Sequence, residues 1–110
     1  MATKHTNELS LKEFKEKIND LIVIDVRGKG YFLIDHIKDA INIESTKRIE
    51  YIAKENKDKQ IALHCHHGNT ARNIVEELLA KGIKNVFFVN TNFSDIAKSG
   101  LEIIYYNKQK

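Results

Sequence analysis

Residues 61–71 read IALHCHHGNTA, and this stretch decides the fold. It begins as an apolar run of strand length that stops at Cys65, which is the only cysteine of the chain. A polar loop containing Gly68 follows, and Gly82 marks the end of the next element. That element is predicted to be a helix by four apolar residues at helical spacing, Ile74, Val75, Leu78 and Leu79.

The predicted strand, loop and helix place Cys65 at the tip of the strand, where the loop N–H groups and the amino end of the helix face its thiol. A helix N-terminus carries about half a positive charge, and inward-turned amides form a nest for anions. We expect a thiol in this position to ionise more readily than a free one, and the thiolate is the nucleophilic form. The alternative interpretation is a buried structural cysteine, as most lone cysteines are.

Length and composition limit the class of protein. A chain of 110 residues, with 42% hydrophobic and 30% charged residues, is expected to form one globular domain over residues 1–110, with its core at about residues 8–104. The single cysteine excludes an internal disulfide and a CxxC zinc site, and it fits a reducing compartment.

The same composition indicates location and excludes some partners. Met1–Ser10 is too polar for a signal peptide, and no apolar run is long enough to span a membrane. We therefore expect a cytoplasmic protein without a membrane partner. The formal net charge of +3 comes from lysines scattered among acids, which argues against a nucleic-acid partner.

Strand and helix patterns alternate along the chain. Ser10 and Glu13 form a predicted capping box at the start of the first helix. The nearly continuous aliphatic run Leu21–Val26 has the composition of a strand covered on both faces. The other expected strands are Ala40–Ile43, Asn85–Val89 and Leu101–Tyr106, and the other expected helices span residues 31–34, 47–57 and 93–98. This alternation predicts an α/β domain with a central parallel sheet and helices on both faces.

The ends of two predicted strands carry the candidate supporting residues. Ligands of such sheets bind beyond the carboxyl ends of the strands. Asp25 and Arg27 follow one strand and Cys65 follows another, so the topology brings all three to the same edge. The alternative is that Asp25 caps a loop and Arg27 pairs with a surface acid.

Two segments of the chain resemble the two signatures of the rhodanese-like sulfurtransferases. The first signature of that family is an Asp-Val-Arg run, an aromatic residue, Gly-His-Ile and then Gly-Ala-x-Asn-Ile. It is matched here by Ile24–Arg27, Phe32, His36, Ile37, Ala40, Asn42 and Ile43. The second signature, an active-site loop followed by a helix and a glycine, is matched by Cys65–Ala71, Leu78, Gly82, Val86 and Val89. The spacing agrees without gaps from Val23 to Val89.

The resemblance implies a three-layer rhodanese-like domain that acts as a thiosulfate sulfurtransferase without a cofactor or metal. Cys65 would be the catalytic nucleophile, taking a sulfane sulfur from a small donor such as thiosulfate and passing it to a thiol or cyanide. The acceptor must come from outside because no second cysteine exists, and a sulfur-accepting protein is one alternative. The substrate-binding loop would consist of His66, His67, Gly68, Asn69 and Thr70, with the amides of residues 66–70 stabilising the persulfide. Asp25 and Arg27 would support it.

Several positions depart from the family pattern. The glycines of Gly-His-Ile and Gly-Ala-x-Asn-Ile are replaced by Asp35 and Asp39, and the glycine pair after the last core strand is replaced by Thr91 and Asn92. Thr70 stands where many single-domain members carry arginine. However, Cys-x-x-Gly-x-Thr-Ala resembles the loop of thiosulfate and mercaptopyruvate sulfurtransferases, so Thr70 is read as a variant.

Three other functions remain open from the sequence. The first is a non-catalytic rhodanese-fold module that binds or carries sulfur. The second is a copper or zinc site in the His64–His67 run, although consecutive residues at a strand end point in different directions. The third is a phosphatase or arsenate reductase, whose loop runs His-Cys, five residues and Arg; here Ala71 holds the arginine position and Arg72 comes one residue late.

Overall fold

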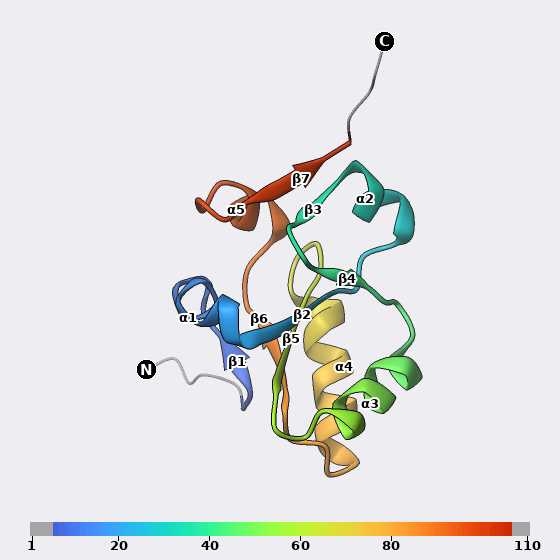
Figure 1. Cartoon of the computed structure of the whole chain (residues 1–110). Coiled ribbons are helices and arrows are strands. Elements are labelled where there is room, and N and C mark those ends of the chain that lie inside the picture. The colour runs from blue at the N-terminus through green and yellow to red at the C-terminus, as the bar shows by residue number, and fades with distance from the viewer. Residues whose placement is uncertain (1–5, 107–110) are drawn as a thin grey trace.

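A five-stranded parallel sheet forms the centre of this protein, whose computed structural model describes residues 6–106 (Figure 1). The strands lie in the order β1-β6-β5-β2-β4. Their bounds are Glu8–Leu9 for β1, Leu21–Asp25 for β2, Ile41–Asn42 for β4, Gln60–His64 for β5 and Val86–Val89 for β6. A separate antiparallel sheet pairs β3, Asp35–Ile37, with β7, Ile103–Tyr105.

The neighbouring strands β2 and β5 are built from the two aliphatic runs that the sequence singles out. Their register pairs Ile24 with Leu63 and Asp25 with His64. Because both faces of these strands are covered, apolar side chains occupy successive positions rather than alternate ones. The two strands run in parallel, so their carboxyl ends lie side by side, and Cys65 follows directly on β5.

Helices cover both faces of the sheet, as the sequence predicts. On one face lie α3, Thr46–Glu55, and α4, Asn69–Ala80; on the other lie α1, Leu11–Lys17, the 3₁₀ turn η1, Ile18–Asp20, and α5, Phe93–Ala97 (Figure 1). The core of the first face includes Ile24, Ile49, Leu63, Val75 and Phe88, and that of the second includes Phe14, Val23, Ala62, Val89 and Ile96. The three-layer α/β fold with a central parallel sheet is therefore confirmed.

Local sequence sets the helix ends. Ser10 Oγ accepts the Glu13 N–H at 3.1 Å and the Glu13 carboxylate accepts the Ser10 N–H at 2.9 Å, which is the predicted capping box of α1. At the end of α4, Gly82 adopts a φ of 86°, and the Ile83 N–H donates to the Leu78 carbonyl at 3.0 Å. This is a Schellman motif, so glycine ends the helix where the sequence indicates.

Two short strands and one pairing differ from the sequence interpretation. Neither β1 nor β3 is predicted, because each has only two or three residues and lies outside the apolar runs from which strands were predicted. The predicted strand Leu101–Tyr106 is present as β7, yet it pairs with β3 and stays outside the parallel sheet. Ile103 packs on the core, while Ile104 and Tyr105 are 40% and 62% exposed, so β7 is not covered on both faces as the central strands are.

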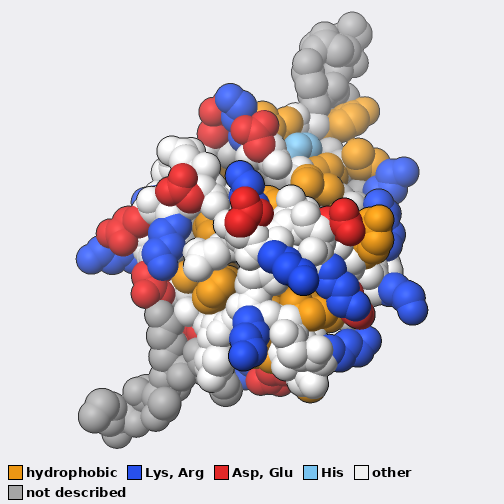
Figure 2. Space-filling view, turned by 60° about the horizontal axis from the view of Figure 1, so that its bottom comes forward, with side chains coloured by type: hydrophobic (Ala, Val, Ile, Leu, Met, Phe, Trp, Pro, Cys, Tyr) orange, Lys and Arg blue, Asp and Glu red, His pale blue; other side chains and the backbone are white. Residues whose placement is uncertain are grey.

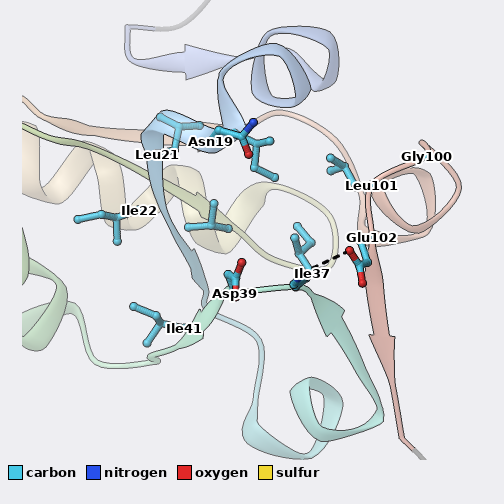
Figure 3. A pocket seen from close by; sticks show the side chains of 12 residues that line it. Asn19, Leu21, Ile22, Ile37, Asp39, Ile41, Gly100, Leu101 and Glu102 are labelled. Carbon is cyan, nitrogen blue, oxygen red and sulfur yellow. Dashed lines mark ion pairs between the residues drawn. The ribbon is translucent and has the colours of Figure 1, made fainter.

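Asp39 occupies a position where the family pattern has glycine. Its φ of 70° lies in the left-handed region, which aspartate tolerates better than most side chains. The turn between β3 and β4 therefore keeps its conformation without the glycine. Asp39 also lines a cavity with Leu21, Ile22 and Glu102, and Cys65 is not among the residues lining it (Figure 3).

The surface carries charges of both signs. On the face drawn in Figure 2, acidic side chains lie among the basic ones. Glu50, for example, pairs with Lys54 at 2.9 Å and with Lys81 at 3.2 Å. Within residues 6–106, no helix combines the length and the apolar composition needed to cross a membrane.

Candidate active site around Cys65

Cys65 lies between the end of β5 and the start of α4, with only 4% of its surface exposed. Its Sγ accepts hydrogen bonds from the N–H groups of Gly68, at 3.1 Å, and Ala71, at 3.3 Å. Both donors stabilise negative charge on the sulfur. The sequence interpretation placed the donors within residues 66–70. Ala71 lies one residue beyond that range, in the first turn of α4, where backbone N–H groups have no partner within the helix.

Gly68 gives the loop its shape. Its φ of 91° lies in the left-handed region, and it precedes the first residue of α4. A Cβ at this position would lie 3.5 Å from the Thr91 carbonyl oxygen, so the loop rests on the connection between β6 and α5. The Phe93 N–H donates to the His66 carbonyl at 2.9 Å and holds the loop on that connection.

Asp25 and Arg27 form a buried ion pair beneath the loop. The Arg27 guanidinium lies 2.8 Å from the Asp25 carboxylate and 3.3 Å from the carboxylate of Asp35, and it stacks over the Phe93 ring at 3.8 Å. Asp25 is fully buried and Arg27 is 4% exposed. The side-chain amide of Asn42 donates to the carbonyls of both Asp25 and Arg27. Arg27 is thus compensated by two acids, and one of them, Asp35, replaces a family glycine.

His64 is buried directly before the nucleophile. Neither ring nitrogen has a hydrogen-bond partner, and the ring stacks on Phe93 with centroids 5.7 Å apart. Burial lowers the pKa of His64 to about 4, although the Asp25 carboxylate, 3.8 Å from Nε2, acts in the opposite direction. The imidazole is therefore neutral at pH 7, and its approach to Asp25 is not a salt bridge.

The pKa of His64 predicts acid sensitivity. The unfolded chain binds a proton at this histidine below about pH 6.5, while the folded protein binds it only near pH 4, so stability falls as the pH drops through this window. We expect a loss of about 3 kcal/mol between pH 7 and pH 4. Urea unfolding of the parent and of His64→Phe across this range measures it. The variant should lack this part of the pH dependence.

His67 provides the matched control, because its side chain is exposed. His67→Phe should retain the acid sensitivity of the parent. An identical pH dependence in the parent and His64→Phe would show that other groups cause the acid loss.

The cavity over Cys65 collects most of the residues that the sequence predicts. It has a volume of about 370 Å³ and is lined by Val26, Arg27, Gly28, Tyr31, Cys65, His66, His67, Asn69 and Thr70. Asp25 lies buried behind Arg27, and Gly68 is buried within the loop. His66 is half-buried, whereas His67, Asn69 and Thr70 are exposed. The loop thus presents polar groups at the mouth and backbone amides at the base.

Several residues of the site had no role in the sequence interpretation, among them Tyr31, Asn42, Ala71 and Phe93. Counting along the predicted helix from Gly68 would have found the Ala71 amide. Tyr31 and Phe93 come from segments whose position over the loop depends on tertiary packing.

The geometry bears on two of the alternative functions. Among residues 6–106, no three histidine, cysteine, aspartate or glutamate side chains lie close enough together to hold a metal ion. A phosphatase requires an arginine that clamps the phosphate beside the cysteine. Arg72 does not line the Cys65 cavity, and its Nε instead lies 4.0 Å from the Glu76 carboxylate on α4.

Comparison with known proteins places the chain among named relatives. The family model for the rhodanese-like domain matches residues 10–99. Thiosulfate sulfurtransferase GlpE of Coxiella burnetii is 29% identical over 87 residues, which cover 79% of this chain and 80% of that protein. The solution structure of hp1203 from Helicobacter pylori has a TM-score of 0.79 at 26% identity, covering 94% of this chain and 96% of that one. A rhodanese-related protein from Thermoplasma volcanium has a TM-score of 0.74 at 25% identity, covering 89% and 97%.

Proposed function

The chain belongs to the rhodanese-like domain family, and from this premise we propose that it is a sulfurtransferase that works through a persulfide on Cys65. One observation carries the proposal: the Sγ of Cys65 accepts N–H groups from Gly68 and Ala71 at the base of a solvent-open cavity. A structural cysteine needs neither these donors nor the cavity. The thiosulfate sulfurtransferases among the relatives indicate thiosulfate as the donor.

In the first half-reaction, the Cys65 thiolate attacks the outer sulfur of thiosulfate. A new S–S bond forms to Sγ, the S–S bond of thiosulfate breaks, and sulfite leaves with its electron pair. The sulfur then remains on Cys65 as a persulfide. The two amides at Sγ stabilise the thiolate before attack, and they do so again when sulfur leaves in the second half-reaction.

The polar residues at the cavity mouth suit the oxygens of the donor. His66, His67, Asn69 and Thr70 all line the cavity, and their imidazole, amide and hydroxyl groups can donate hydrogen bonds to a sulfonate-like group. Arg27 contributes little free charge, because Asp25 and Asp35 already compensate it. Its proposed role, with Asp25, is to fix the end of β2 beneath the loop.

Intact mass spectrometry tests the proposal directly. After treatment with thiosulfate and removal of the excess, the protein should carry one additional sulfur atom, and cyanide should remove it. Cys65→Ala, treated in the same way, should gain nothing. A protein that stays unmodified at millimolar thiosulfate, or a variant that gains the same mass, contradicts the assignment of Cys65.

A further inference from the structure

A second cavity, of about 470 Å³, adjoins the one that contains Cys65. The two share Arg27, Tyr31, His66 and His67. Beyond these, the second cavity is lined by Ile34, Asp35, Asn92, Phe93 and Ser94. These residues come from the end of α2 (Lys29–Ile34), the first residue of β3 and the start of α5, so the cavity extends away from the nucleophile.

The rings of Tyr31 and His66 meet where the two cavities join. They pack edge to face, with centroids 4.3 Å apart and planes at 85°. Tyr31 also lies over Gly28, where an added Cβ would be 3.8 Å from Tyr31 Cδ2. A molecule in the second cavity therefore reaches Cys65 by passing this aromatic pair.

The size of the second cavity exceeds what the donor or cyanide needs. Thiosulfate has five heavy atoms and cyanide has two, while cavities of roughly 300–1,000 Å³ are typical for organic ligands. Its walls mix the apolar side chains of Tyr31, Ile34 and Phe93 with the polar ones of Asn92 and Ser94. Such walls suit an organic molecule with a short carbon skeleton.

Charge further restricts the ligand. Arg27 is the only lysine or arginine lining the second cavity, and it is paired with the carboxylates of Asp25 at 2.8 Å and Asp35 at 3.3 Å. Arg27 and Asp35 line the cavity and Asp25 is buried behind Arg27, and the three groups together carry a net charge of −1. An anion gains nothing there, whereas a neutral or positively charged molecule is favoured.

We infer that the second cavity is the acceptor subsite and that it takes an organic thiol whose body is neutral or positively charged. The inference rests on the proposed function, since it concerns the release of sulfur from Cys65. The thiolate of the acceptor attacks the outer sulfur of the persulfide, a new S–S bond forms, and the bond to Sγ breaks. Its electron pair stays on Cys65, which returns as a thiolate. Sulfur passes from one thiolate to another, and no oxidant is consumed.

The outer rim of the cavity allows this thiol to be free or borne by a polypeptide. Large apolar side chains on α2 and at β7 are exposed next to it, namely Leu33, Ile34, Ile104, Tyr105 and Tyr106. Figure 1 places β7 beside α2 and β3 at the upper end of the fold, and Figure 2 shows hydrophobic side chains at the upper right of the molecule. A test with both kinds of thiol separates the two sources.

The experiment measures how fast a preformed persulfide is discharged. The protein is loaded with thiosulfate, freed from excess donor, and mixed with cysteamine, which is cationic, or with mercaptoacetate, which is anionic. Intact mass follows the loss of sulfur, and cyanide discharge shows that the persulfide is competent. A peptide with one cysteine between two lysines forms the polypeptide arm.

Ile34→Lys is the informative variant, because Ile34 is 59% exposed and lines only the second of the two cavities. The added charge should slow discharge by cysteamine and speed discharge by mercaptoacetate, each by about threefold. The ratio of the cysteamine rate to the mercaptoacetate rate should therefore fall about tenfold relative to the parent. Ile41→Lys is the matched control. Ile41 is 47% exposed on β4 and lines the separate cavity of Figure 3, so the ratio should stay within about twofold.

Each outcome decides the inference. A rate ratio that falls in Ile34→Lys but not in Ile41→Lys supports the subsite. Faster discharge by the peptide than by cysteamine identifies a polypeptide thiol as the source. Faster discharge by cysteamine identifies a free thiol. An unchanged ratio in Ile34→Lys, or an equal change in Ile41→Lys, overturns the subsite while leaving the proposed function intact. If no persulfide forms on loading, the proposed function fails and the inference fails with it.

Discussion

Cys65→Ser should lower thiosulfate–cyanide sulfurtransferase turnover by a factor on the order of 10³ or more. The hydroxyl of serine is a poor nucleophile at neutral pH and cannot form a persulfide. The oxygen still fits the position of Sγ, where Gly68 and Ala71 donate their N–H groups, so the loop keeps its hydrogen bonds. The fold should therefore survive. Steady-state assay of thiocyanate formation measures the turnover, and a thermal melt of the same sample measures the fold.

The melt separates loss of chemistry from loss of structure. A variant that melts with the parent and has no turnover supports Cys65 as the nucleophile. Turnover within about tenfold of the parent would exclude a persulfide on this residue, because the chain has no other cysteine to replace it.

Arg27→Met should lower the free energy of unfolding by about 3–5 kcal/mol, because it leaves the fully buried Asp25 carboxylate without its cation. Methionine retains much of the length and apolar contact of the arginine stem. The loss of unfolding free energy therefore comes from removing the positive charge and not from a change in side-chain volume. Urea unfolding at pH 7 measures it. Sulfurtransferase activity should also fall, since Arg27 stacks on Phe93, whose N–H donates to the His66 carbonyl of the loop.

Two further variants identify the cause. Adding Asp25→Asn to Arg27→Met removes both charges but keeps a side-chain oxygen for the N–H of residue 27, and it should recover part of the loss. Lys54→Met breaks the surface pair of the exposed Lys54 with the half-buried Glu50 and should change stability far less. Equal destabilisation by Arg27→Met and Lys54→Met would mean that burial of the Asp25–Arg27 pair does not increase the cost of removing its cation.

Much of the fold follows from local sequence. The aliphatic runs that form β2 and β5 and the capping box at Ser10 are confirmed in the structure, as is the glycine stop at Gly82. Each depends on neighbours within a few residues, which is the range over which periodicity and capping act. The strands β1 and β3 are too short to carry such a pattern.

Within the candidate site, the sequence by itself determined that Cys65 lies at a strand end, before a glycine loop and a helix N-terminus. Only the tertiary structure decided that Asp35 pairs with Arg27 in addition to Asp25. It also decided that Phe93 lies against the loop and Arg27, and that Tyr31 lies where the two cavities join. The physical reason is distance along the chain. The loop conformation depends on residues that follow one another, whereas the charge and shape around it come from α2, β3 and α5, and sheet packing alone brings these elements together.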